Sequence, residues 1–143
     1  AALTEKPVIA AIALRVQDPE ASRAFFTALG FTTMDIPVPP EQSRTWRGAP
    51  DSGVLVAFQV GGTFMVLEPP LAGTAVDDSF DERRIGVDHM AVNVDSRDDL
   101  QELVDRLAGL GVATAGIEMD LVLGHEYVCF RDPDNVQWEF YQG

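Results

Sequence analysis

The chain has 143 residues, of which 46% are apolar and 23% charged, and this composition excludes a disordered protein. Its 23 acidic and 10 basic side chains give a formal net charge of −13, which repels nucleic acid and anionic membranes as partners. This charge either serves solubility alone, as most acidic surfaces do, or attracts a cationic small molecule. A single cysteine, Cys129, excludes an intrachain disulfide and a thiolate zinc site, and it fits a reducing, cytoplasmic setting.

The first half of the chain predicts a strand at 8–16, followed by an amphipathic helix. Asp18 is the expected N-cap of this helix, and Gly30 is expected to end it. The proline-rich segment 35–40 is expected to be a surface loop. Short β-rich segments follow at 43–46, 54–60 and 63–68.

The second half repeats this order. A strand is predicted at 85–94, and Ser96 with Asp99 resembles a capping box at the start of a second helix. Further strands are predicted at about 117–121, 127–131 and 136–141. Each half therefore has the order β-α-β-β-β, and residues 69–84, which have no clear periodicity, are the expected linker.

Two local sequences are typical of a known family. The segment 28–31 (ALGF) ends the first helix, and 130–135 (FRDPDN) precedes a last strand containing Trp138-Glu139-Phe140. With the repeated unit, these resemble the vicinal oxygen chelate superfamily, which includes glyoxalase I, extradiol dioxygenases and bleomycin resistance proteins. The resemblance implies an α+β fold in one domain, 1–143: two tandem βαβββ modules, at about 7–68 and 85–143, form curved mixed sheets around a cavity.

The resemblance also implies a metal site. In metal-using members, the first and last strands of each module supply the ligands. Here these positions offer His89 and Glu139 in module two and Glu68 in module one, but the fourth position, seven residues before Asp18, holds Ala11 in place of His or Gln. A site for Fe, Mn, Ni or Zn with three protein ligands and a metal-free pocket both remain open.

Strand alternation bears on the same residues, because positions two apart share a face. On the strands containing His89 and Glu139, the intervening residues are all apolar and are expected to meet the helices. His89 and Glu139 would then face the cavity as metal ligands or catalytic acid–base groups. A hydrogen-bonded His89–Glu139 pair that only joins two strands, and a solvated Glu68 at a strand end, are the structural alternatives.

Other candidates have a structural alternative as well. Arg15 is either an anion clamp or the partner of a carboxylate, and the aromatic candidates either line a pocket or pack in the core. His125 is expected to be an exposed loop residue rather than a substitute ligand or base, and Cys129 to be a small buried residue. The full set of expected pocket residues is Arg15, Trp46, Phe58, Phe64, Gln137 and Tyr141.

Three functions are compatible with these features. The first is a glyoxalase-like protein that binds a small oxygen-rich organic molecule and carries out lyase, isomerase or ring-opening dioxygenase chemistry. The second is a metal-free protein that sequesters a drug, of the bleomycin-resistance type, and the third is a scaffold with an occluded cavity. The resemblance further implies a homodimer, with the modules paired within one chain or swapped between chains.

Overall fold

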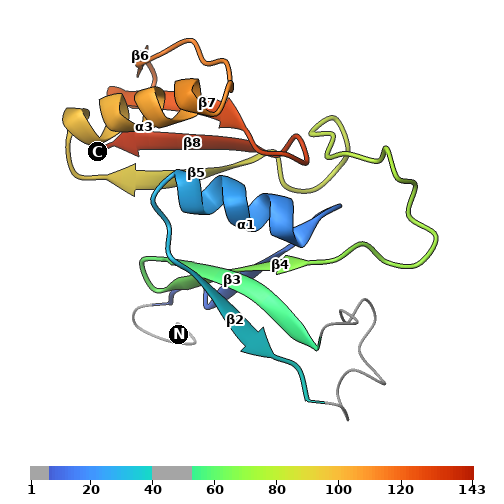
Figure 1. Ribbon diagram of the computed structural model, residues 1–143. Helices are drawn as coiled ribbons and strands as arrows, with labels where there is room; N and C mark the ends of the chain where they lie inside the picture. Colours follow the sequence, from blue (N-terminus) through green and yellow to red (C-terminus); the bar gives the residue numbers. More distant parts are fainter. Residues whose placement is uncertain (1–6, 40–52) are drawn as a thin grey trace, which may run out of the picture. The chain divides into compact units, whose positions relative to one another are not determined.

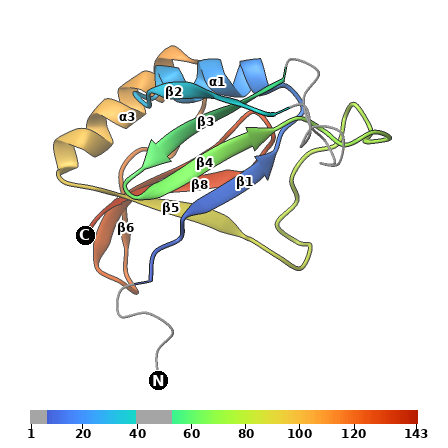
Figure 2. The ribbon, with the colours of Figure 1, turned by 90° about the horizontal axis from the view of Figure 1, so that it is seen from below.

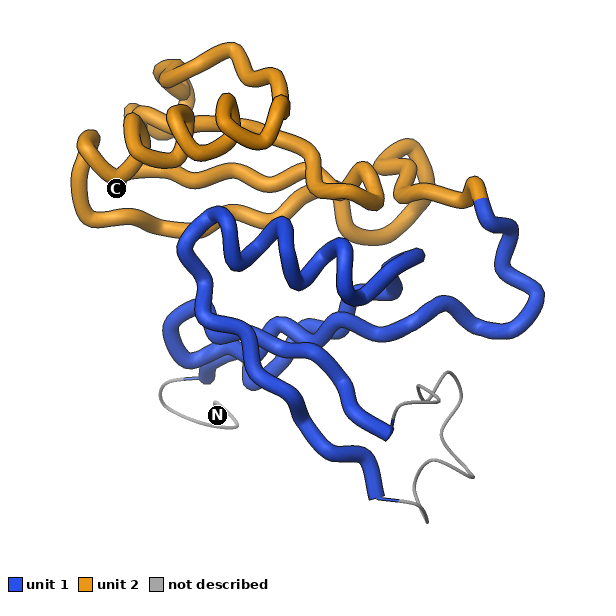
Figure 3. The backbone as a smooth tube through the Cα atoms, in the orientation of Figure 1, with its two compact units in different colours: residues 1–76 blue, residues 77–143 orange. Residues whose placement is uncertain are grey.

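The computed structural model describes residues 7–39 and 53–143. It divides into two compact units, unit 1 (Ala1–Val76) and unit 2 (Asp77–Gly143), coloured separately in Figure 3. Each unit contains a four-stranded mixed sheet and a helix (Figures 1 and 2). In the part of the chain that is described, no helix is long and apolar enough to span a membrane.

Unit 1 has the sheet order β1-β4-β3-β2, in which β1 runs parallel to β4 and the other pairs are antiparallel. The helix α1 packs against β2 and β4. The elements are β1 (Ala11–Arg15), α1 (Pro19–Ala28), β2 (Thr33–Pro37), β3 (Val54–Val60) and β4 (Thr63–Glu68).

Unit 2 has the same topology, with the sheet order β5-β8-β7-β6 and β5 parallel to β8. The helix α3 packs against β5, β7 and β8. The elements are β5 (His89–Val94), α3 (Arg97–Gly109), β6 (Glu118–Asp120), β7 (His125–Arg131) and β8 (Gln137–Gln142). The predicted α+β fold with a duplicated βαβββ unit is confirmed, and the sheets are open rather than closed.

The two helices begin where the capping residues predict. The Asp18 carboxylate accepts hydrogen bonds from the backbone N–H groups of Glu20 and Ala21. Ser96 and Asp99 form a complete capping box, each side chain bonded to the other's backbone N–H. These bonds satisfy donors that the first helical turn leaves without partners, so the strand-to-helix junction is fixed in the same way in both units.

Each sheet buries the side that faces its helix. The other side of the unit 2 sheet is half-buried to exposed, whereas in unit 1 Leu55 and Ala57 on that side of β3 are buried. In unit 1, Phe26 of α1 stacks on Phe58 of β3 with ring centroids 4.6 Å apart. In unit 2, Trp138 of β8 and Leu100 and Leu107 of α3 are fully buried. Side-chain burial alternates along β5 and β8, because every second residue faces the helix.

The prediction of a surface loop at 35–40 is wrong, because β2 (Thr33–Pro37) includes the first half of this segment. β2 is the edge strand of its sheet, so Pro37, which has no N–H to donate, is tolerated at its end. Arg23 of α1 also binds the Asp35 carboxylate and holds the strand to the helix. The strand predicted at 43–46 lies outside the described residues.

Candidate ligand-binding site

The open face of the unit 2 sheet carries four of the nine predicted site residues: His89, Gln137, Glu139 and Tyr141. His89 on β5 and Glu139 on β8 both belong to this face, with side chains 37% and 25% exposed. β5 is parallel to β8, and His89 pairs with Gln137 while Ala91 pairs with Glu139. Neighbouring strands thus bring the imidazole and the carboxylate together.

His89 lies between two carboxylates. Its Nε2 is 3.4 Å from Oε2 of Glu139, and its Nδ1 is 2.6 Å from Oδ1 of Asp88. Which nitrogen donates depends on the tautomer, and the contacts become ion pairs when the ring is protonated. This arrangement can position the imidazole and can pass a proton between the ring and Glu139.

The duplication makes it possible to locate the equivalent positions in unit 1. Ala11 lies seven residues before the N-cap Asp18, and His89 lies seven residues before the N-cap Ser96. Ala11 on β1 is therefore the equivalent of His89 on β5. It carries no donor atom on its side chain.

The last strands can be compared through the register of the sheets. Ala91 pairs with Glu139 in unit 2, and Ala13, the equivalent of Ala91, pairs with Val66 in unit 1. Val66 is therefore the equivalent of Glu139. Unit 1 has an apolar side chain at both positions where unit 2 has His89 and Glu139.

Glu68 lies two residues beyond Val66 and pairs with Arg15 in the register. Its Oε2 is 2.9 Å from Nη2 of Arg15, and Nη1 of Arg15 donates to the carbonyl oxygen of Pro69 at 2.7 Å. Glu68 is 9% exposed, so it is not a solvated strand end. The arginine thus holds the carboxylate that was the expected third metal ligand.

These positions do not fit a resident divalent metal. Structural and catalytic sites for Zn and related ions use at least three protein donors. Unit 2 provides His89 and Glu139, whereas the equivalent positions in unit 1 provide none. Over residues 7–39 and 53–143, no three His, Cys, Asp or Glu side chains are grouped so that they could hold a metal ion.

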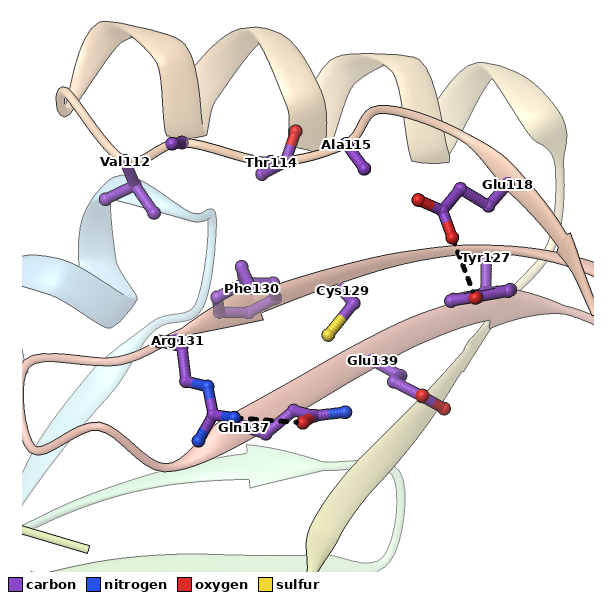
Figure 4. A pocket seen from close by; sticks show the side chains of 11 residues that line it. Val112, Thr114, Ala115, Glu118, Tyr127, Cys129, Phe130, Arg131, Gln137 and Glu139 are labelled. Atoms are coloured by element: carbon purple, nitrogen blue, oxygen red, sulfur yellow. Dashed lines mark hydrogen bonds between the residues drawn. The ribbon is translucent and has the colours of Figure 1, made fainter. Parts of the chain in front are cut away.

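Unit 2 also contains a pocket of about 630 Å³, shown in Figure 4. The pairing of β6 with β7 stops at Glu118 and Tyr127, and the preceding segment 112–115 is not paired with β7. The pocket lies between this unpaired segment and the sheet. Gly116, at φ +77°, lies between this segment and β6. The lining residues are Val112, Ala113, Thr114, Ala115, Glu118, Tyr127, Cys129, Phe130, Arg131, Gln137 and Glu139.

Two neutral acids in the pocket lie beside carboxylates. The Tyr127 hydroxyl donates to Oε2 of Glu118 at 2.9 Å, and this bond, followed by burial and nearby negative charge, raises the pKa of Tyr127. Burial, followed by the charge of Glu139, raises the pKa of the Cys129 thiol. Both groups keep their protons at neutral pH, and Cys129, expected to be a small buried residue, is partly exposed to the pocket.

Arg131, the one cationic side chain among the described residues that line the pocket, is already paired. Its Nη1 and Nη2 donate to the two carboxylate oxygens of Glu82 at 3.0 and 2.7 Å. The pairing lowers the pKa of Glu82 to about 2. Arg131 also donates to the carbonyl oxygen of Asn135 and, at 3.4 Å, to the side-chain oxygen of Gln137.

The other predicted pocket residues are dispersed. Phe58 is fully buried in the unit 1 core, where α1 covers its face of the sheet, so the core-packing alternative holds for it. Phe64 is 37% exposed on β4, and Tyr141 lies beside His125, with ring centroids 5.5 Å apart. Gln137 lines the pocket, whereas Trp46 lies outside the described residues.

His125 begins β7 and is half-buried, so it is not an exposed loop residue. Of the eleven residues that line the pocket, the sequence predicted only Gln137 and Glu139 as site residues. Glu118 and Tyr127 are among those it missed. Alternation along β7 could have identified Tyr127, because it lies two residues before Cys129, which pairs with Glu139. Glu118 gave no such signal, since β6 has only three residues.

The duplicated topology and the open sheets can now be compared with known proteins. The sequence model of the Glyoxalase/Bleomycin resistance protein/Dioxygenase superfamily matches residues 8–140. The chain belongs to this superfamily. No curated protein matches the sequence significantly.

Solved structures of the superfamily resemble this member over nearly its whole length. A glyoxylase/bleomycin resistance protein/dioxygenase domain from Frankia sp. EAN1pec is 27% identical, with a TM-score of 0.75, and the match covers 97% of this chain and 99% of that one. A lactoylglutathione lyase from Agrobacterium tumefaciens is 20% identical (TM-score 0.61; coverage 96% and 95%). A fosfomycin resistance protein from Listeria monocytogenes is 18% identical (TM-score 0.64; coverage 96% and 94%). The last two show the shared fold alone.

Proposed function

We propose that this superfamily member binds a small organic molecule in the unit 2 pocket and does so without a bound metal. The observation that carries the proposal is the pair Ala11 and Val66, which stand where unit 2 has His89 and Glu139. Metal-assisted lyase, isomerase or dioxygenase chemistry needs a metal held by about three protein donors, and these two positions supply none. Of the predicted functions, the metal-free binding protein agrees best with this donor set.

The pocket's chemistry describes the molecule it would hold. A volume of about 630 Å³ is within the usual range for small-molecule sites. Tyr127 and Arg131 use donors on Glu118 and Glu82, and the carboxylates of Glu118 and Glu139 are the charged acceptors that the pocket offers. An oxygen-rich ligand would therefore bind through its hydroxyl groups as donors.

Acid–base catalysis by His89 and Glu139 is the second candidate. The observation in its favour is the imidazole held between Asp88 and Glu139, one carboxylate at each ring nitrogen. Glu139 lines the pocket, so a proton taken from a bound molecule at its carboxylate could pass to Nε2 of His89.

The homodimer that the family resemblance implies and the cytoplasmic location that the single cysteine fits are also proposals.

Thermal melting with a panel of polyhydroxylated and amine-bearing compounds tests binding. We expect at least one compound to raise the melting temperature to the same extent with and without EDTA, since a ligand that binds only the folded state stabilises it. The increase should disappear in Glu139→Gln and persist in Glu102→Gln, whose carboxylate lies on the exposed side of α3. An increase that EDTA abolishes would contradict the proposal.

The bound compound should be recovered unchanged, as seen by NMR after prolonged incubation. Conversion that stops in His89→Ala would instead establish the second candidate, acid–base catalysis. Conversion in both proteins would exclude His89 as the base.

A further inference from the structure

The pocket has two kinds of wall. Val112, Ala113 and Ala115, on the segment before β6, supply apolar surface. Glu118 of β6 and Glu139 of β8 supply carboxylates, as Figure 4 shows. An occupant that fits both walls has an apolar body and a polar end.

The carboxylates of this pocket lack a permanent cation. Arg131 is bound to Glu82, and among the residues that the structure describes no Lys or Arg pairs with Glu118 or Glu139. The hydrogen bond from Tyr127 to Glu118 is neutral, and His89 compensates the charge of Glu139 only when it is protonated. The polar end of the pocket therefore carries an excess of negative charge.

The neighbouring acids respond to the same charge. The hydrogen bond to Glu118, followed by burial and then by the charges of Glu118, Glu139 and Asp120, raises the pKa of Tyr127. Burial, followed by the charge of Glu139, raises the pKa of Cys129. The same carboxylate charges would favour a group that carries a positive charge.

We infer that the ligand of this pocket is an amphipathic cation: an aromatic or aliphatic amine whose ammonium lies at the end of the pocket that carries Glu118 and Glu139 and whose apolar body lies against the segment 112–115. The inference rests on the proposed function and specifies its ligand. Ammonium donors make charge-assisted hydrogen bonds with carboxylates, which are stronger than those of a neutral hydroxyl. The net charge of −13 would also speed the approach of such a cation.

Three indoles of similar size and different charge test the inference by isothermal titration: tryptamine, tryptophol and indole-3-acetate. We expect tryptamine to bind at least about tenfold more tightly than tryptophol, the difference between a charged and a neutral hydrogen bond. We expect indole-3-acetate to bind most weakly. In Glu118→Gln, tryptamine should lose about tenfold in affinity while tryptophol changes little.

Glu102→Gln is the matched control, because it removes the same charge from the chain outside the pocket. Its affinity for tryptamine should equal that of the wild type. If tryptophol binds as tightly as tryptamine, the preference for a cation is overturned and the proposed binding function stands. If none of the three binds, this inference is overturned, while the panel of compounds described above judges the proposed function separately.

Discussion

Replacing Asp132 with Ala is expected to lower the free energy of unfolding by about 3 kcal/mol. Asp132 is 7% exposed and begins the turn between β7 and β8. Its Oδ1 accepts the backbone N–H groups of Asp134 and Val136, each at 2.9 Å, and its Oδ2 accepts Nε1 of Trp138 at 3.1 Å. Alanine would remove the carboxylate that accepts from these three buried donors, and the loss of these bonds away from water is the costly part of the change.

Asp132→Asn should be milder, with a loss of about 1 kcal/mol. Burial raises the pKa of Asp132, because the ionised carboxylate is costly away from water. Asparagine avoids that cost, and its side-chain oxygen can still accept the two backbone hydrogen bonds. Its NH₂ group, however, stands in place of Oδ2 and cannot accept the hydrogen bond from the indole of Trp138. We therefore expect Asp132→Ala to be the least stable, Asp132→Asn to be intermediate and the wild type to be the most stable.

Chemical denaturation followed by circular dichroism measures these differences. Asp120→Ala is the control, because the Asp120 carboxylate also accepts two backbone N–H groups in a turn but does so at the surface. Its expected loss is below about 1 kcal/mol, since water replaces the lost acceptor. Equal losses for Asp132→Ala and Asp120→Ala would show that the buried turn has no special role.

Phe58→Ala is expected to destabilise the protein by about 4 kcal/mol. The ring is fully buried and contacts Phe26 at 4.6 Å and Phe31 at 4.9 Å between centroids. Removing it would lose both aromatic contacts and leave a cavity between β3 and α1. A residue that lined a pocket would cost far less to remove.

Phe64→Ala provides the comparison, because Phe64 is in the same sheet but 37% exposed on the opposite face. Its expected loss is about 1 kcal/mol. Thermal or chemical unfolding of the two variants measures the difference. If Phe64→Ala proved as damaging as Phe58→Ala, the assignment of Phe58 alone to the core would be wrong.

Features set by local sequence were predicted well. Asp18 and Ser96 cap their helices because each needs only its own side chain and the next three residues. The helix side of β8 followed from alternation for the same reason. These are also the features that give the two units the same topology.

Features that depend on how strands pair were not predicted from the sequence. Glu68 and Val66 share a face of β4, so alternation cannot tell which of them is the equivalent of Glu139. Only the register between β1 and β4 decides it, because it places Val66 opposite Ala13 and Glu68 opposite Arg15. Phe58 presented the same difficulty, since alternation separates two faces without showing which one a helix covers.

The central claim, binding without a resident metal, is tested most directly by isothermal titration of EDTA-treated, dialysed protein with Zn²⁺, Mn²⁺, Ni²⁺ and, anaerobically, Fe²⁺. With donors at His89 and Glu139 and none at the equivalent positions, Ala11 and Val66, the account predicts no saturating one-to-one site at micromolar protein concentration, and the same weak heats in wild type and His89→Ala. Tight one-to-one binding that His89→Ala abolishes would contradict it.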